Sequence, residues 1–150
     1  MTDENPELLA LPMLLLSAAR TLVDAIHTGV EERGFTGLRP AHGFAFARLA
    51  PDGATIAELG EHLGITKQAA SQLVDELTRR GYVQAGPHPR DARAKLITLT
   101  GLGWACTQAA DAAALDAVSA WADVLGADRV GELTADLARV ARVGRLRPLW

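Results

Sequence analysis

The stretch from Thr55 to Thr100 constrains the fold of this chain more than any other part of it. Thr55 and Glu58 have the spacing of a capping box, in which a hydroxyl and a carboxylate bind the free amides at the start of a helix. Apolar residues then recur at i, i+3 and i+7, as on one face of a helix, at Ile56, Leu59 and Leu63. This pattern predicts a short amphipathic helix that ends at Gly64, a residue that suits the left-handed conformation after a helix.

A second helix is expected from Lys67 to about Arg80, capped by Thr66. The link between the two helices is so short that it predicts a sharply turned pair. The inward face of the second helix is apolar, with Ala70, Leu73, Val74 and Leu77. Its outward face carries amides and donors near the N-terminus, where a helix that reads DNA bases enters the major groove. An ordinary solvated face would explain the same polar residues.

A hairpin is expected after Gly81, with strands at Tyr82–Gln84 and Leu96–Leu99. Residues 85–95 between them contain prolines and a glycine, which indicate a loop. The loop carries three cations and a histidine, and no apolar residue larger than Ala or Pro. Such a tip has little to pack against, so the sequence predicts that it acts outside the fold.

The helix pair followed by a wing that reads Pro-Arg-Asp-Ala-Arg-Ala-Lys-Leu over residues 89–96 resembles the MarR (multiple antibiotic resistance regulator) family of winged-helix transcription factors. Motifs carry the resemblance from residue 38 to 103, and the flanking helices are similar only in pattern and length. It implies one domain over residues 1–150, mainly α with a small β wing. A winged helix-turn-helix core at 38–100 would lie between dimerisation helices at 6–33 and 101–145.

The resemblance also implies that double-stranded DNA is a partner. The recognition helix would contact the major groove, where Gln pairs with adenine, Lys with guanine and Ser with either, through Thr66, Lys67, Gln68, Ser71 and Gln72. In the wing, Arg93 would enter the minor groove and Asp91, two residues earlier, would help to hold it. Arg90 and Lys95 would complete the minor-groove and phosphate contacts. A flexible charged loop is the alternative interpretation of the wing.

The distribution of charge favours this interpretation more than the total does. The whole chain has a net charge of −3, whereas residues 62–100 carry six basic and three acidic side chains. A local basic patch governs contact with phosphates better than the sum over a chain.

The helical segments outside this region offer more apolar surface than a winged helix needs to fold. They are expected at 6–32, at Ala41–Leu49, at Gly101–Leu125, and from about Asp128 to Ala141. Pro12 should kink or restart the first of these helices, and Phe44 and Phe46 are candidates for the inward face of the second. The economical explanation, again as in the family, is a homodimer in which the first and last helices interdigitate. Two-fold symmetry then predicts a pseudo-palindromic operator with half-sites about 34 Å apart.

A small-molecule effector follows from the resemblance alone. Many relatives bind aromatic or phenolic acids in a crevice between the dimerisation helices and the DNA-reading unit. Here the crevice would be lined by His27, His42, Phe44, Arg48 and Trp104, and an arginine and a histidine beside aromatics could hold an aromatic carboxylate. A surface ion pair for Arg48 and a core position for the phenylalanines explain these residues equally well.

Other function classes find little support in the sequence. The single cysteine, Cys106, suits a reducing cytosol and is expected to be a small buried hydrophobe. The acidic N-terminus lacks the basic start of a signal peptide, and the apolar run Leu8–Leu16, interrupted by Pro12, is too short to span a bilayer. No metal-ligand spacing, phosphate loop or nucleophile–base pair is present, so neither a metal nor a cofactor nor an enzymatic activity is expected.

The sequence therefore predicts a cytoplasmic, sequence-specific regulator of transcription that binds double-stranded DNA, a homodimeric repressor relieved by a small molecule. The alternative is a winged-helix protein-interaction module that docks its basic wing on an acidic partner and does not read DNA sequence. Four arginines lie near the C-terminus, namely Arg139, Arg142, Arg145 and Arg147. They either complement the dipole of the last helix or contact DNA or an acidic partner.

Overall fold

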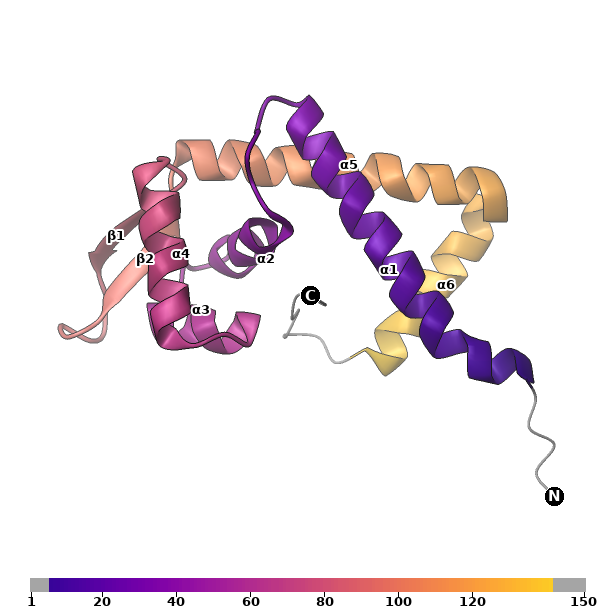
Figure 1. Ribbon diagram of the computed structural model, residues 1–150, viewed down its shortest axis with the longest axis horizontal. Helices are drawn as coiled ribbons and strands as arrows, with labels where there is room; N and C mark the ends of the chain where they lie inside the picture. The colour runs from indigo at the N-terminus through magenta and orange to yellow at the C-terminus, as the bar shows by residue number, and fades with distance from the viewer. Residues whose placement is uncertain (1–5, 142–150) are drawn as a thin grey trace, which may run out of the picture.

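The computed structural model describes residues 6–141, which form six helices and one two-stranded antiparallel sheet (Figure 1). The helices are α1 (Pro6–Glu32), α2 (Pro40–Leu49), α3 (Ile56–Leu63), α4 (Lys67–Arg79), α5 (Gly101–Leu125) and α6 (Ala127–Val140), and the strands are β1 (Val83–Pro87) and β2 (Lys95–Leu99). The predicted class, mainly α with a small β wing, is confirmed. Helix α5 runs along the molecule from the hairpin to the opposite end, where α6 lies (Figure 1).

Side-chain caps define the helix-turn-helix, as the sequence predicted. The amide of Glu58 donates to Oγ1 of Thr55 at 3.2 Å, and the amide of Thr55 donates to Oε2 of Glu58 at 2.8 Å. Gly64 ends α3 with a φ of 68°. Oγ1 of Thr66 then accepts the amide of Ala69 at 3.1 Å and so starts α4. Each cap of this kind stabilises a helix by about 0.5–2 kcal/mol, so the turn between α3 and α4 is fixed from both sides.

The wing has longer strands than the sequence predicted. Its pairing runs from Val83 opposite Leu99 to Pro87 opposite Lys95, so part of the expected loop belongs to the sheet. The wing is also attached at a second place that the sequence did not indicate. The backbones of Ala54 and Ile97 exchange two hydrogen bonds, of 3.0 and 2.8 Å. This bridge fixes the base of the wing to the connection between α2 and α3.

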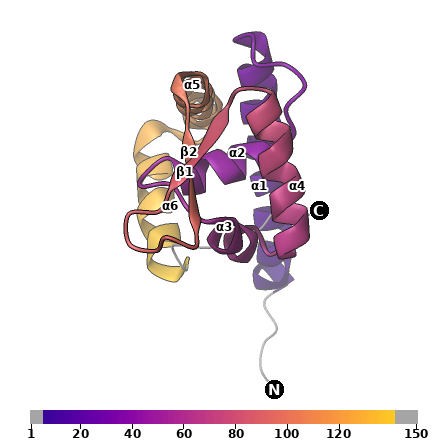
Figure 2. The same ribbon diagram turned by 90° about the vertical axis from the view of Figure 1, so that its left-hand side faces the viewer.

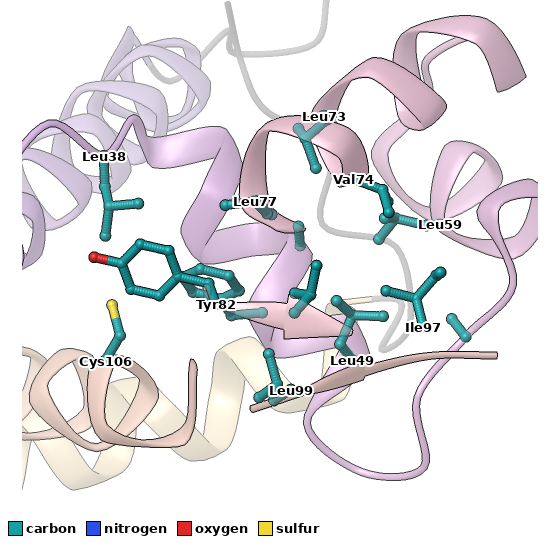
Figure 3. Close-up of a cluster of buried hydrophobic side chains, with 14 of the residues drawn as sticks. Leu38, Leu49, Leu59, Leu73, Val74, Leu77, Tyr82, Ile97, Leu99 and Cys106 are labelled. Atoms are coloured by element: carbon teal, nitrogen blue, oxygen red, sulfur yellow. The ribbon is translucent and has the colours of Figure 1, made fainter. Parts of the chain in front are cut away.

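The core lies among α2, α3, α4 and the sheet (Figure 3). Its most deeply buried apolar side chains, each at most 2% exposed, include Leu49, Leu59, Leu77, Val83 and Ile97. Burial of one such side chain contributes about 1.5–3 kcal/mol. Of the two phenylalanines expected on the inward face of α2, Phe46 is the buried one, and its ring centre lies 5.5 Å from that of Tyr82. The buried face of α2 follows the spacing i, i+3, i+4, i+7 from His42, which leaves Phe44 half-buried beside it.

Helix α1 packs on α5 at close range, because a glycine lies at their contact. A Cβ atom built on Gly29 would come within 2.7 Å of Cβ of Ala113. Beside this contact, Arg33 donates to the carbonyl of Gly29 at 2.9 Å and to Asp116 at 2.6 Å. The two helices are therefore joined by shape and by a salt bridge.

Two expectations about the N-terminal helix are corrected. Helix α1 is continuous through Pro12, because the proline stands near its N-terminal end, where it removes a single intrahelical hydrogen bond. The sequence indicated that the apolar run Leu8–Leu16 is too short to span a bilayer. The continuous helix, however, is long and apolar enough over Glu7–Glu32 to cross a membrane by length and composition. One such helix near an N-terminus is weak evidence for a membrane, because helices of soluble proteins pass the same test. Arg142, Arg145 and Arg147 lie outside the described residues.

Candidate nucleic-acid interface

Helix α4 has one apolar and one polar side. Its buried residues are Ala70, Leu73, Val74 and Leu77. On the opposite side Thr66, Lys67, Gln68 and Gln72 are exposed and Ser71 is half-buried. Within residues 6–141, the side chains of Lys67, Gln68 and Gln72 make no hydrogen bond or ion pair. Their donors and acceptors are available to a second molecule, in the part of the helix where base contacts are made in helix-turn-helix proteins.

The tip of the wing is folded by its own short polar side chains. Oδ1 of Asp91 accepts the amide of Arg93 at 2.9 Å, and Nδ1 of His88 accepts the amide of Arg90 at 3.1 Å. Asp91 thus holds the main chain of Arg93 and leaves its guanidinium exposed. The side chains of Arg90, Arg93 and Lys95 all point into solvent, and among the described residues none of the three forms a salt bridge.

Figure 2 looks onto the end of the molecule that carries α3, α4 and the hairpin. Helix α4, one side of which is polar, and the hairpin with the basic tip thus lie at the same end of the molecule, although they are separate elements in the sequence. A helix and a cationic loop at the same end match the geometry in which a winged helix binds duplex DNA. The helix lies in the major groove, and the loop lies over the backbone or the minor groove.

A cluster that the sequence did not reveal ties the C-terminal half of α4 to the start of α2. It consists of Arg39, His42, Glu76 and Arg80, and is called the Arg39 cluster below. Oε2 of Glu76 lies 3.0 Å from Nη2 of Arg39 and 3.6 Å from Nε2 of His42, and its Oε1 lies 3.8 Å from Nη1 of Arg80. Arg80 also donates to the carbonyls of Gly37 and Thr36, at 2.7 and 2.8 Å. Only the i, i+4 pair of Glu76 and Arg80 could have been read from the sequence.

His42, expected in an effector crevice, is a fully buried part of this cluster. Its Nδ1 accepts the amide of Arg39 at 2.9 Å and so caps the first turn of α2. Burial lowers the pKa of His42 below its usual 6.5, because the charged ring would lose its hydration. Arg39 and Arg80 lower this pKa further, whereas Glu76 raises it.

This depressed pKa predicts an acid-sensitive fold. Unfolded chains bind a proton at His42 near pH 6.5, whereas the folded protein resists it, so the free energy of unfolding should fall as the pH drops below about 6.5. The slope from this one site is at most about 1.4 kcal/mol per pH unit. Urea denaturation between pH 7.5 and 5 of the parent and His42→Gln should show this loss only in the parent. Parallel pH curves for the two proteins would contradict the assignment.

A cavity of about 230 Å³ lies where α1, α2 and α5 meet. Its wall is mostly apolar, with Val23, Ile26, Phe44 and Cys106 among its residues. The polar and charged residues on the wall are His27, Arg39, Thr107 and Asp111. Cys106 is 2% exposed, and burial raises the pKa of its thiol to about 11, so the thiol behaves as a small hydrophobe.

Only two of the five residues expected to hold an effector line this cavity, namely His27 and Phe44. Arg48 instead donates to the carbonyl of Gly53 at 3.0 Å and lies 3.8 Å from Glu58, so it supports the turn before α3. Trp104 is 45% exposed on α5, outside the cavity wall. The crevice was expected from the family resemblance, and neither the resemblance nor the helix pattern reveals how each helix is rotated about its axis. In the described part of the chain, no group of His, Cys, Asp and Glu is placed to hold a metal ion.

The MarR family model matches residues 36–94, which span α2, the helix pair and the tip of the wing. A search of the curated proteins finds no match. Several solved structures share the fold over most of the chain. A probable transcriptional regulator from Pseudomonas aeruginosa is 25% identical, with a TM-score of 0.66 and coverage of 87% of this chain and 96% of that one.

Two structures of MarR from E. coli are similar to the same extent. The wild-type apo form is 24% identical with a TM-score of 0.72, and 88% of this chain and 97% of that chain are covered. A mutant of MarR complexed with operator DNA is 22% identical with a TM-score of 0.70, and 94% and 100% are covered. The family match over residues 36–94 and the shared fold confirm the resemblance seen in the sequence: the winged helix of this chain is similar to that of the MarR family of transcriptional regulators.

Proposed function

We propose that this protein is a sequence-specific regulator of transcription that binds double-stranded DNA as a homodimer in the cytoplasm. The observation that carries the proposal is the free polar side of α4 at the same end as the basic wing tip. The fold is shared with a MarR structure solved in complex with operator DNA. Binding, rather than catalysis, is the proposed activity. The proposed contacts are Thr66, Lys67, Gln68, Ser71 and Gln72 in the major groove, and Arg90, Arg93 and Lys95 at the minor groove and phosphates, with Asp91 shaping the tip.

A homodimer would cover the apolar side chains that the single chain leaves exposed. Such side chains gather on the first helix and the last two, and include Leu8, Leu9, Leu11, Met13, Leu14, Leu115, Val118, Val124 and Val140. Exposed apolar surface on this scale marks an interface. We assign the dimerisation role to 6–33 and 101–145 and the DNA-reading role to 38–100, within one domain over 1–150. A two-fold axis then places the recognition helices about 34 Å apart, on a pseudo-palindromic site.

We further propose that the regulator is a repressor that a small molecule releases from DNA. Support comes from the cavity at the junction of α1, α2 and α5, between the proposed dimerisation helices and the winged helix. A largely apolar wall with a few polar residues is typical of small-molecule sites, and it suits an aromatic or phenolic ligand. His27 and Phe44 remain in this proposal, whereas His42, Arg48 and Trp104 do not.

Salt dependence tests whether the wing contacts phosphates. The logarithm of the affinity for duplex DNA should fall steeply with the logarithm of the salt concentration, and Arg93→Ala should flatten this slope by about one unit. Arg129→Ala is a matched control, because Arg129 is an exposed cation in the first turn of α6, far from the wing. Fluorescence anisotropy over a salt series measures both slopes. An unchanged slope in Arg93→Ala, or no duplex binding by the parent, would favour a protein-docking wing instead.

Base readout by α4 is tested separately. Gln68→Ala and Gln72→Ala should each weaken binding to the preferred site by about 1–3 kcal/mol and change affinity for random duplex little. The preferred site is obtained by selecting bound fragments from random duplex DNA with the purified protein, which also reports half-site spacing and symmetry. Variants that keep the discrimination of the parent would show that these amides do not read bases.

A further inference from the structure

The recognition helix α4 carries two acids, and the fold uses only one of them. Glu76 binds Arg39 at 3.0 Å and lies 3.8 Å from Arg80. Its neighbour Asp75 is exposed. In the described part of the chain the carboxylate of Asp75 makes no hydrogen bond or salt bridge, although Arg79 follows one turn later. The oxygens of Asp75 are therefore available to a second molecule.

The position of Asp75 on α4 is that of a base-reading side chain. A helix that lies along the major groove presents side chains at i, i+3, i+4 and i+7 to the bases. This spacing is met by four residues outside the buried side of α4, namely Gln68, Ser71, Gln72 and Asp75. The proposed base contacts end at Gln72, yet the same polar side of the helix continues to Asp75.

A negative charge at this position does not stabilise the folded chain. Asp75 lies in the C-terminal half of α4, where the helix dipole favours cations rather than acids. On DNA the carboxylate would also lie close to the phosphates, which repel it. Such a charge lowers the affinity for any duplex in which no base offers it a hydrogen-bond donor.

We propose that Asp75 is a specificity-determining residue, whose carboxylate accepts a hydrogen bond from the amino group of a cytosine in the major groove. Cytosine presents N4 as a donor there, and aspartate pairs with it. Thymine presents the acceptor O4 instead, and adenine presents its acceptor N7 beside its amino group, so both repel a carboxylate. The inference rests on the proposed function and adds a residue to its DNA-reading site.

The geometry of the helix also predicts where this cytosine lies. Three residues of an α-helix advance by about 4.5 Å, and one base-pair step is about 3.4 Å. The cytosine should therefore lie one or two base pairs from the base that Gln72 contacts. It should lie on the side away from the base that Gln68 contacts, because the three residues follow one another along the same side of the helix.

Asp75→Asn tests the assignment, because asparagine keeps the shape of the side chain and removes its charge. The parent should bind the selected duplex roughly ten-fold more tightly than one in which this C·G pair is replaced by T·A. In Asp75→Asn this ratio should fall to about two-fold, because an amide can also donate to O4 of thymine. Its affinity for random duplex should rise by about two- to five-fold, because one repulsive charge is removed. Anisotropy measures these affinities, and selection from random duplex DNA locates the relaxed position.

Asp123→Asn is the matched control. It removes the same charge from an exposed residue in the last turn of α5, at the opposite end of the molecule (Figure 1). This variant should bind and discriminate as the parent does. Thermal denaturation followed by circular dichroism should give Asp75→Asn a Tm no lower than that of the parent, because its carboxylate has no partner in the fold.

The inference is overturned if Asp75→Asn selects the same bases as the parent at every position, even if its affinity for random duplex rises. It is also overturned if the relaxed position lies between those relaxed by Gln68→Ala and Gln72→Ala, or if the Tm falls, which would assign the carboxylate to the fold. In each of these cases the parent still selects its site, so the proposed function stands. A parent that selects no sequence would refute the proposed function, and this inference with it.

Discussion

Replacing Leu9 and Leu14 together by glutamate should abolish the dimer and lower the affinity for the selected duplex by about 10²–10⁴-fold. The two leucines are 67% and 63% exposed in the single chain, so the charges should not disturb the folded subunit. In the dimer interface the two glutamate carboxylates would be buried without a partner, and the free energy of desolvating them would prevent the subunits from associating. A single winged helix would then bind one half-site without the gain from the second. Analytical ultracentrifugation measures the mass, circular dichroism the fold, and anisotropy the affinity.

Leu9→Met together with Leu14→Met is the control for this prediction, because it conserves volume and apolarity. This variant should remain dimeric and bind as the parent does. A glutamate variant that stays dimeric would place the interface elsewhere. One that becomes monomeric but keeps its affinity would show that a single subunit suffices for binding.

Replacing Gly103 by alanine should destabilise the fold by about 3 kcal/mol. The new Cβ would overlap the backbone carbonyl of Tyr82 and lie 3.1–3.2 Å from the side chain of Leu99. Neither the carbonyl nor the strand can move without disturbing the wing, whose base is paired with the rest of the core. For a chain of 150 residues, a loss of this size lowers the Tm by roughly 6–12 °C. Thermal denaturation followed by circular dichroism measures the shift.

Gly101 provides a matched control two residues earlier in the same helix. No atom lies within 4 Å of a Cβ built there, and its backbone is not left-handed. Gly101→Ala should therefore leave the Tm unchanged or raise it slightly, because alanine restricts the unfolded chain. Equal Tm values for the two alanine variants would show that the start of α5 yields to accommodate the extra methyl group.

The parts of the fold that depend on neighbours in the sequence were predicted well. The capping box at Thr55 and Glu58, the left-handed Gly64 and the cap of α4 are local signals, each encoded within four residues. The two sides of α4 follow from a period of 3.6 residues, so its exposed polar side was also predictable. The proposed DNA contacts remain predictions, since they concern a molecule that the structure does not contain.

Features that depend on contacts across the chain were not predictable in this way. The bridge between Ala54 and Ile97 joins two backbones, and backbone pairing leaves no mark on side-chain type. The Arg39 cluster joins the start of α2 to α4, and charged residues at such a separation have many possible partners. The same limit explains the effector residues. A pattern places Arg48 on a helix but does not say whether it turns toward the cavity or toward Gly53 and Glu58.

The close contact of Gly29 with Ala113 has a consequence for the spacing of an operator. The backbones of α1 and α5 approach closely at Gly29, and the salt bridge from Arg33 to Asp116 lies beside this contact. The two helices are therefore expected to move as one rigid unit. In a two-fold symmetric dimer, these rigid helix pairs would fix the distance between the two winged helices and their relative rotation about the DNA axis. One extra base pair between half-sites rotates them by about a tenth of a turn. A rigid dimer of the kind proposed would not follow that rotation, so it would select DNA sites by the spacing of their half-sites as well as by their sequence.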